Sequence, residues 1–150
     1  MTLAVMAVLG ALALPGMGSQ LDRQRLRHAA NTLAGDLAEA RFLAAQRGQA
    51  VHVLARDGPD WCWSVSLDPG CGCGSPQACR IHAVAGSDHP GIRLLAPMSA
   101  RLDPNGLPEA PTHVVFESRA GDRLRVDVTA QGRSRVCAVS GKWPQMPACP

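Results

Sequence analysis

The sequence predicts an α+β fold: a long N-terminal helix packed on an antiparallel, β-sandwich-like globular domain. An uncharged apolar run, residues 1–14, leads into a pattern of helical period that ends near Arg47. From Gln49 onward, apolar side chains instead alternate with polar ones at strand period. The six cysteines all lie in this second part. We therefore expect a helix over residues 1–47 and a β-rich domain with disulfide-stapled loops and a C-terminal tail over residues 48–150.

The helix is predicted by a stripe of small and aliphatic side chains spaced three or four residues apart. The stripe consists of Leu26, Ala30, Leu33, Leu37, Ala40 and Ala44. Gly48 suits the end of the helix, and residues 2–47 as one helix would reach roughly 70 Å. Pro15, followed by Gly16 and Gly18, should kink the helix or melt it locally. The apolar run is shorter than the span of about 20 residues that a membrane helix needs, so it resembles a membrane helix without its first turns.

Two strands, residues 51–56 and 61–67, should form the first hairpin of the domain around a turn at residues 57–60. Trp61 and Trp63 fall on one face of the second strand, where core packing is favoured over ligand binding. Residues 68–90 are rich in Gly, Pro, Cys and Ser and are expected to form a stapled loop. A short strand at residues 92–95 and a proline-rich loop at residues 96–112 should follow.

The C-terminal third should form three antiparallel strands, at residues 113–118, 123–129 and 133–139, before an irregular tail. Alternation predicts the side chains that face the core: Leu124, Val126, Val128, Val136 and Ala138. It also predicts those that face solvent: Arg123, Arg125, Asp127, Thr129, Arg133, Arg135 and Cys137. The outer face of this part of the domain is therefore expected to be rich in arginine.

An even number of cysteines in a small, exported-looking domain favours disulfides, and their spacing does not match paired zinc knuckles. We expect no metal site. The pair Cys137–Cys149 would close a short C-terminal loop, and Cys62 should then pair within the loop that carries Cys71, Cys73 and Cys79. Direct pairing of Cys71 with Cys73 is disfavoured, because one intervening residue strains the bridge.

Catalytic chemistry is poorly represented. The histidines are scattered, no nucleotide-binding or hydrolase motif appears, and Asp57 and Asp60 share a turn in which aspartate has a structural use. We therefore expect no enzyme, and in particular no disulfide-rich secreted hydrolase, and no cofactor. The net charge of +3 is too mild to establish a nucleic-acid partner by itself.

The arginines predicted on the outer face are the best candidates for a binding surface. Arg123 and Arg125 stand on one strand, Arg133 and Arg135 on the next, and Asp127 is the only acid expected among them. One interpretation is an ordinary solvated face. The other is a strip that binds the phosphates of double-stranded DNA without sequence preference. The DNA-binding strip would then be Arg133, Arg135, Arg123, Arg125 and Lys142, with Trp143 stacking on a base or sugar.

Three blocks of the sequence carry a resemblance to a known family: residues 2–15; residues 37–41 with Ala44, Ala45, Gln46 and Arg47; and Gly132-Arg133-Ser134-Arg135. In these blocks the chain resembles the type IV pilins and type II secretion pseudopilins, and within them the FimT/GspH family of minor pilins. The family begins with a basic leader ending in glycine, followed by Phe-Thr-Leu-Ile-Glu. Because neither that leader nor that glutamate is found here, Met1 is interpreted as a misplaced start or an artificial boundary, with a true reading frame that extends upstream.

The resemblance implies a minor pilin of a type IV pilus that acts in pilus assembly or priming, with capture of extracellular DNA for natural transformation as a further role. The alternative is a GspH-like minor pseudopilin of a type II protein secretion system. The implied partners are other pilins, through the N-terminal helix, the inner membrane before assembly, and double-stranded DNA. The implied location is a single-pass inner-membrane protein with a periplasmic domain, and then the pilus at the cell surface. In the family's G-R-x-R stretch, Gly132 would set the turn while Arg133 and Arg135 contact phosphates.

Overall fold

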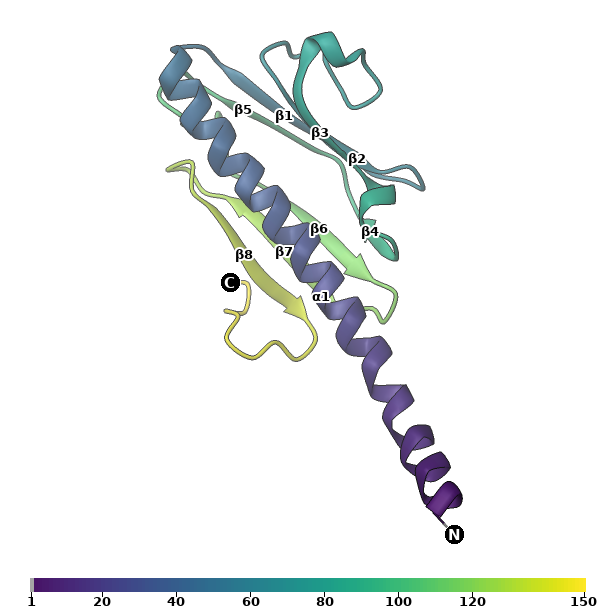
Figure 1. Cartoon of the computed structure of the whole chain (residues 1–150). Helices are drawn as coiled ribbons and strands as arrows, with labels where there is room; N and C mark the ends of the chain where they lie inside the picture. The colour runs from purple at the N-terminus through teal and green to yellow at the C-terminus, as the bar shows by residue number, and fades with distance from the viewer. Residues whose placement is uncertain (1) are drawn as a thin grey trace.

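The computed structural model describes residues 2–150, with side chains described from Gly16 onward. Its organising element is the helix α1, Thr2–Arg47, which lies across both sheets and projects beyond them at its N-terminal end (Figure 1). Every residue of the predicted apolar stripe is buried, as is Ala29, which confirms the packing face. Gly48 follows with a φ of 63°, a left-handed conformation that glycine adopts without strain and that ends the helix.

The helix is continuous through Pro15, Gly16 and Gly18. The local melting that the sequence suggested as one alternative is therefore wrong. Proline removes a single backbone hydrogen bond and crowds the preceding turn, and the regular helix on both sides outweighs that defect.

The first sheet, sheet A, is antiparallel with the strand order β3-β2-β1-β5. It consists of β1 (Val51–Arg56), β2 (Cys62–Ser66), β3 (Arg80–Ala85) and β5 (Met98–Leu102). The predicted hairpin of β1 and β2 is confirmed, with Val53 opposite Val65. Both faces of β2 are buried. Trp63 packs in the core, while Ser64 on the other face donates a hydrogen bond to the carbonyl of Cys71 in the covering loop.

Two strands of sheet A lie where loops were expected. β3 follows a short 3-10 helix, Gln77–Cys79, inside the segment taken to be a stapled loop. β5 begins directly after Pro97 in the segment taken to be proline-rich loop. Both strands are at the edges of the sheet, where pairing with one neighbour is enough and a preceding proline is tolerated. Pairing with β2 determines β3, whose local pattern is weak, whereas β5 combines pairing with β1 and a regular alternation of buried and exposed residues.

The second sheet, sheet B, is also antiparallel, with the order β4-β6-β7-β8. It consists of β4 (Ile92–Leu94), β6 (Thr112–Ser118), β7 (Arg123–Val128) and β8 (Ser134–Ser140). A second 3-10 helix, Gly86–Asp88, precedes β4. The inner faces of both sheets and the buried stripe of α1 form one core, in which Trp63 and Phe116 are the largest fully buried side chains.

Three disulfides connect Cys62 with Cys73, Cys71 with Cys79, and Cys137 with Cys149. The expected C-terminal pair is confirmed, and Cys62 pairs within the expected loop. The prediction that Cys137 faces solvent is wrong, because its side chain is 2% exposed. The bridge draws the tail over the edge of β8, where the backbone N–H of Ala138 donates to the carbonyl of Pro147.

Candidate functional site

The projecting part of α1 is the first candidate site. Residues 16–21 are exposed, including Met17 at 69% and Leu21 at 47%, and Leu26 is the first residue of the stripe that packs in the core. An exposed surface of this kind, continuous with an apolar sequence, is suited to packing against another apolar surface. In the part of the chain that the structure describes, no helix combines the length and apolarity of a membrane-crossing segment.

Arg23 ties three segments together where α1 leaves the sheets. Its Nε lies 2.8 Å from Oδ2 of Asp122 in the turn between β6 and β7. Its guanidinium also lies 6.0 Å from the ring centroid of Trp143, whose Nε1 donates to the carbonyl of Ser140. Trp143 packs against the core cluster as well, so the structure gives this ring a role in fixing the tail.

Glu117 organises the arginines at one end of the outer face of sheet B. Its side chain is 7% exposed and accepts hydrogen bonds from Arg93 on β4 and from Arg123 on β7, with 2.6 Å between Arg123 Nε and Glu117 Oε2. The hydrogen bond from Arg123, followed by that from Arg93, lowers the pKa of Glu117 below its ordinary value. Each of the two guanidinium groups therefore forms an ion pair with the same buried carboxylate.

Asp127 has the same role at the other end of this face. Its Oδ1 lies 2.7 Å from Nε of Arg125, and its Oδ2 lies 3.2 Å from Nε of Arg135 on β8. The prediction that Asp127 is the only acid on the face is wrong, because the register of β6 and β7 places Glu117 opposite Arg123. Asp127 itself is buried rather than solvent-facing. Four arginines therefore share two carboxylates, which leaves the face with a modest positive charge.

The remaining candidates of the predicted DNA-binding strip are not gathered with these four arginines. Arg133 lies in the turn before β8, which is closed by a hydrogen bond from the N–H of Gly132 to the carbonyl of Thr129. Lys142 lies beyond the other end of β8. Gly132 has a φ of 74°, and a side chain here would collide with the carbonyl of Gly106. Its place in the turn is as predicted, and the close approach adds a packing reason for glycine.

The inner face of sheet A holds an aromatic cluster that the sequence revealed only in part. Core packing of Trp61 and Trp63 is confirmed, and Phe116 meets both rings edge-on. His89 lies parallel to both indoles at centroid distances of about 6 Å, and His28 of α1 approaches it at 5.3 Å. Burial, and then His28, lower the pKa of His89 below its ordinary value of 6.5. No local pattern links these residues, because separate elements bring them together.

No constellation of catalytic or metal-binding type appears beside these groups. Among residues 2–150, no three histidine, cysteine, aspartate or glutamate side chains gather in a way that could hold a metal ion. The structure instead has an exposed helix, a C-terminal tail held by a disulfide, and an arginine-rich face. All three suit assembly with other macromolecules.

A long helix whose C-terminal part lies across two antiparallel four-stranded sheets is the pilin class of fold. The chain belongs to the GspH family, because the family model described as type II transport protein GspH matches residues 29–132. It is accordingly a minor pilin or pseudopilin, a structural protein rather than an enzyme.

Two solved structures of the type IV minor pilin FimU from Pseudomonas aeruginosa strain PAO1 are similar in fold. One has a TM-score of 0.61 at 19% identity and covers 83% of this chain and 96% of that chain. The other, in a second crystal form, has a TM-score of 0.54 at 21% identity and covers 81% and 98%, respectively. A search of curated proteins found no match.

Proposed function

We propose that this protein is a minor pilin of a type IV pilus that acts in pilus assembly through α1. The projecting, exposed part of the helix carries the proposal, because a helix that no sheet covers needs another surface to bury its apolar side chains. The similarity in fold to FimU, a type IV minor pilin, over nearly all of that chain supports the pilus, and the family model named for type II transport keeps the secretion filament as the alternative. Residence in the inner membrane before assembly, with the sheets in the periplasm, is part of the proposal.

The test is complementation of a deletion strain with a variant altered only on the projecting surface. Met17→Glu combined with Leu21→Glu should abolish or strongly reduce surface pili, while the protein still accumulates, because both side chains are exposed. Leu107→Glu, at a side chain 42% exposed in the loop before β6, is the matched control and should leave pili intact. Normal pili in the double variant, together with a loss of type II secretion, would instead establish the pseudopilin alternative.

We propose sequence-independent binding of double-stranded DNA as a second candidate. The supporting observation is the outer face of sheet B, where four arginines exceed two carboxylates and Arg93 and Arg135 keep 73% and 52% of their side chains exposed. Because the carboxylates offset part of the charge, few phosphates would be neutralised. The logarithm of affinity should then fall against the logarithm of salt with a slope of about −2 to −3.

The DNA proposal is tested with the full chain in detergent micelles and a fluorescent duplex. Arg133→Gln combined with Arg135→Gln should flatten the salt slope by about one to two units on every sequence alike. Arg47→Gln combined with Arg56→Gln removes the same charge elsewhere and is the control. Arg23 is unsuitable as a control, since its pairing with Asp122 makes it structural. Equal losses in the two double variants would show that only net charge is being measured.

A further inference from the structure

The edges of the two sheets differ in how far they are closed. The tail covers the edge of β8, where Cys149 donates its N–H to the carbonyl of Ala138 and the disulfide fixes the contact. A return loop meets the edge of β5, where the N–H of Glu109 bonds to the carbonyl of Arg101. β4 is only three residues long. β3, six residues long, is therefore the one long edge strand among the described residues that no other segment covers.

The backbone of β3 presents groups that do not pair with β2. Gly86 donates its N–H to the carbonyl of Trp61, which makes these two residues a hydrogen-bonded pair. Such pairs alternate along an antiparallel ladder, so Val84, opposite Trp63, is also bonded to β2. The backbone groups of Ala83 and Ala85 therefore point away from β2. The outward N–H of Ala85 is taken by Oδ2 of Asp88. Across the described residues, no backbone or side-chain partner is found for the N–H and C=O of Ala83.

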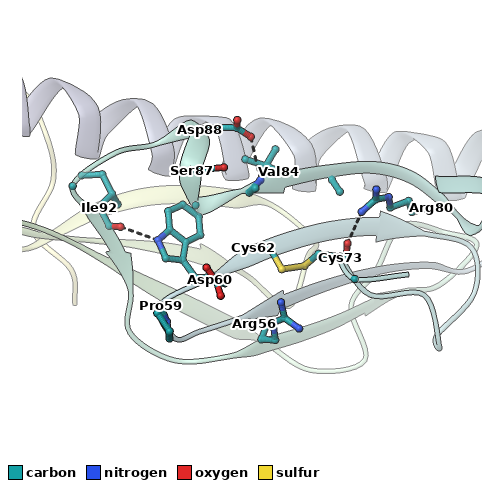
Figure 2. Close-up of a pocket in the computed structure, with 16 residues that line it drawn as sticks. Arg56, Pro59, Asp60, Cys62, Cys73, Arg80, Val84, Ser87, Asp88 and Ile92 are labelled. Carbon is teal, nitrogen blue, oxygen red and sulfur yellow. Dashed lines mark hydrogen bonds between the residues drawn. A yellow bond between two sulfur atoms is a disulfide. The ribbon is translucent and has the colours of Figure 1, made fainter. Parts of the chain in front are cut away.

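Two hollows lie along this edge strand. The larger, about 600 Å³, is bounded by β3, by the turn between β1 and β2, and by the loop held through the Cys62–Cys73 bridge (Figure 2). The second, about 340 Å³, is lined by residues 80–83 with Gln77. Ala83 lines both, and its small side chain leaves room above the strand. Hollows beside an unpaired edge provide what an added strand needs, which is backbone partners and space for alternate side chains.

Charges of opposite sign stand at the two ends of β3. Arg80 begins the strand, and Asp88 lies just beyond its end, as Figure 2 shows. Arg56 and Asp60 line the wall of the larger hollow. Within the described part of the chain, none of these four takes part in an ion pair, although Arg80 donates a hydrogen bond to the carbonyl of Cys73. The outer face of sheet B, by contrast, has every carboxylate paired.

We propose that the edge of β3 binds an extended segment of another polypeptide as an added antiparallel strand. The segment's backbone pairs with Ala83, its alternate side chains enter the two hollows, an acidic side chain meets Arg80, and a basic one meets Asp88. Antiparallel pairing is the more stable arrangement per residue, and the charges at the two ends then fix the direction of the incoming chain. The bulge at Val65–Ser66 and the capping of Ala85 shorten the edge and limit indiscriminate pairing.

The test uses the isotope-labelled full chain in detergent micelles and synthetic octapeptides with blocked ends. The first peptide alternates valine and threonine, with lysine near its N-terminus and glutamate near its C-terminus. It should produce saturable amide shifts confined to residues 77–88. Exchanging the lysine and glutamate should weaken binding by about five- to tenfold at low ionic strength, since two attractions become repulsions. Methylating the backbone nitrogens that face β3 should abolish binding.

The matched protein variants are Asp88→Asn and Asp103→Asn. Each keeps a side-chain oxygen that can accept the backbone hydrogen bonds made by the native aspartate, but only the first removes charge beside β3. Asp88→Asn should weaken binding of the first peptide by about two- to fivefold, and Asp103→Asn should not change it. Equal affinity for both peptide charge patterns, shifts centred on sheet B, binding that survives backbone methylation, or no binding would each overturn the proposal.

Discussion

The two sheets differ in whether the charged side chains on and beside them have ionic partners and in whether their edge strands are covered. On sheet B, Glu117 and Asp127 are each buried between two arginines, and a bridged tail closes the free edge. On sheet A, a loop held by two disulfides covers β2, while Arg80 and Asp88 stay without ionic partners among the described residues and β3 keeps an open edge. The comparison teaches that the number of charges on a face does not measure its availability to a partner. On the arginine-rich face each of the four arginines contacts a carboxylate, whereas beside β3 Arg80 and Asp88 have no ionic partner among the described residues.

The largest expected effect comes from removing the bridge that covers sheet A. Cys62→Ser combined with Cys73→Ser should lower the free energy of unfolding by about 3 kcal/mol from loop closure. A further loss of about 1 kcal/mol should follow, since the buried Ser64 beneath the loop loses its acceptor, the carbonyl of Cys71. Urea unfolding measures both contributions together.

Sheet B provides the control for this experiment. The loop closed by Cys137 and Cys149 is almost the same length, with a sequence separation of 12 against 11. Replacing both of these residues with serine should therefore cost about 3 kcal/mol, with a smaller additional loss, because water can replace the tail at the half-exposed edge of Ala138 but cannot reach the buried Ser64. If the two double variants are equally destabilised, the loop over sheet A contributes nothing beyond its bridge.

Breaking a buried carboxylate cluster on sheet B should have an intermediate effect. Glu117→Gln leaves Arg93 and Arg123 without their shared anion and should cost about 1–2 kcal/mol of unfolding free energy. Glu109→Gln is the matched control, because Glu109 also pairs with an arginine, Arg101, but is 65% exposed. Its loss should stay below about 0.5 kcal/mol in urea unfolding. Similar costs for the two variants would mean that burial does not strengthen the Glu117 cluster.

The sequence predicted the elements in which local pattern and tertiary structure agree. The stripe of α1, the first hairpin and the inward residues of β7 follow from periodicity, and the terminal bridge follows from loop size. β3 was missed because its sequence, with two alanines, carries little periodic signal. β5 does alternate between buried and exposed residues, but it lies in a proline-rich segment that was taken to be a loop. Their positions depend on pairing with β2 and β1, which sequence spacing does not reveal.

The candidate site was harder to predict for a related reason. Alternation placed Arg123, Arg125 and Arg135 on one outer face, but Glu117 reaches them only through the register of β6 on β7. A shift of one residue would have pointed Glu117 into the core, so its role depends on register rather than composition. Arg133 was assigned to a strand and lies in the preceding turn, an error of one residue at a boundary. The cluster of His28 and His89 needs the docked helix.

Acidification should lower the stability of the domain in two steps, one from His89 in the aromatic cluster and one from Glu117 on sheet B, with smaller effects than those above. Burial and His28 lower the pKa of folded His89 below 6.5, so the unfolded chain binds a proton more readily. The stability contributed by neutral His89 is complete above pH 6.5 and declines as the pH falls toward its folded pKa. Asp88, from the adjoining 3-10 helix, opposes the shift. Glu117 has a lowered pKa, so its contribution is complete above pH 4.5 and declines below that value.

Urea unfolding across this range should therefore show two declines, each with a slope of at most about 1.4 kcal/mol per pH unit for one proton. His89→Asn should remove the upper decline and leave the lower one, whereas Glu117→Gln should do the reverse. His28→Gln should reduce the upper decline without abolishing it, because burial remains as the larger cause. An unchanged upper decline in His89→Asn would show that the proton responsible for it binds to a group other than His89.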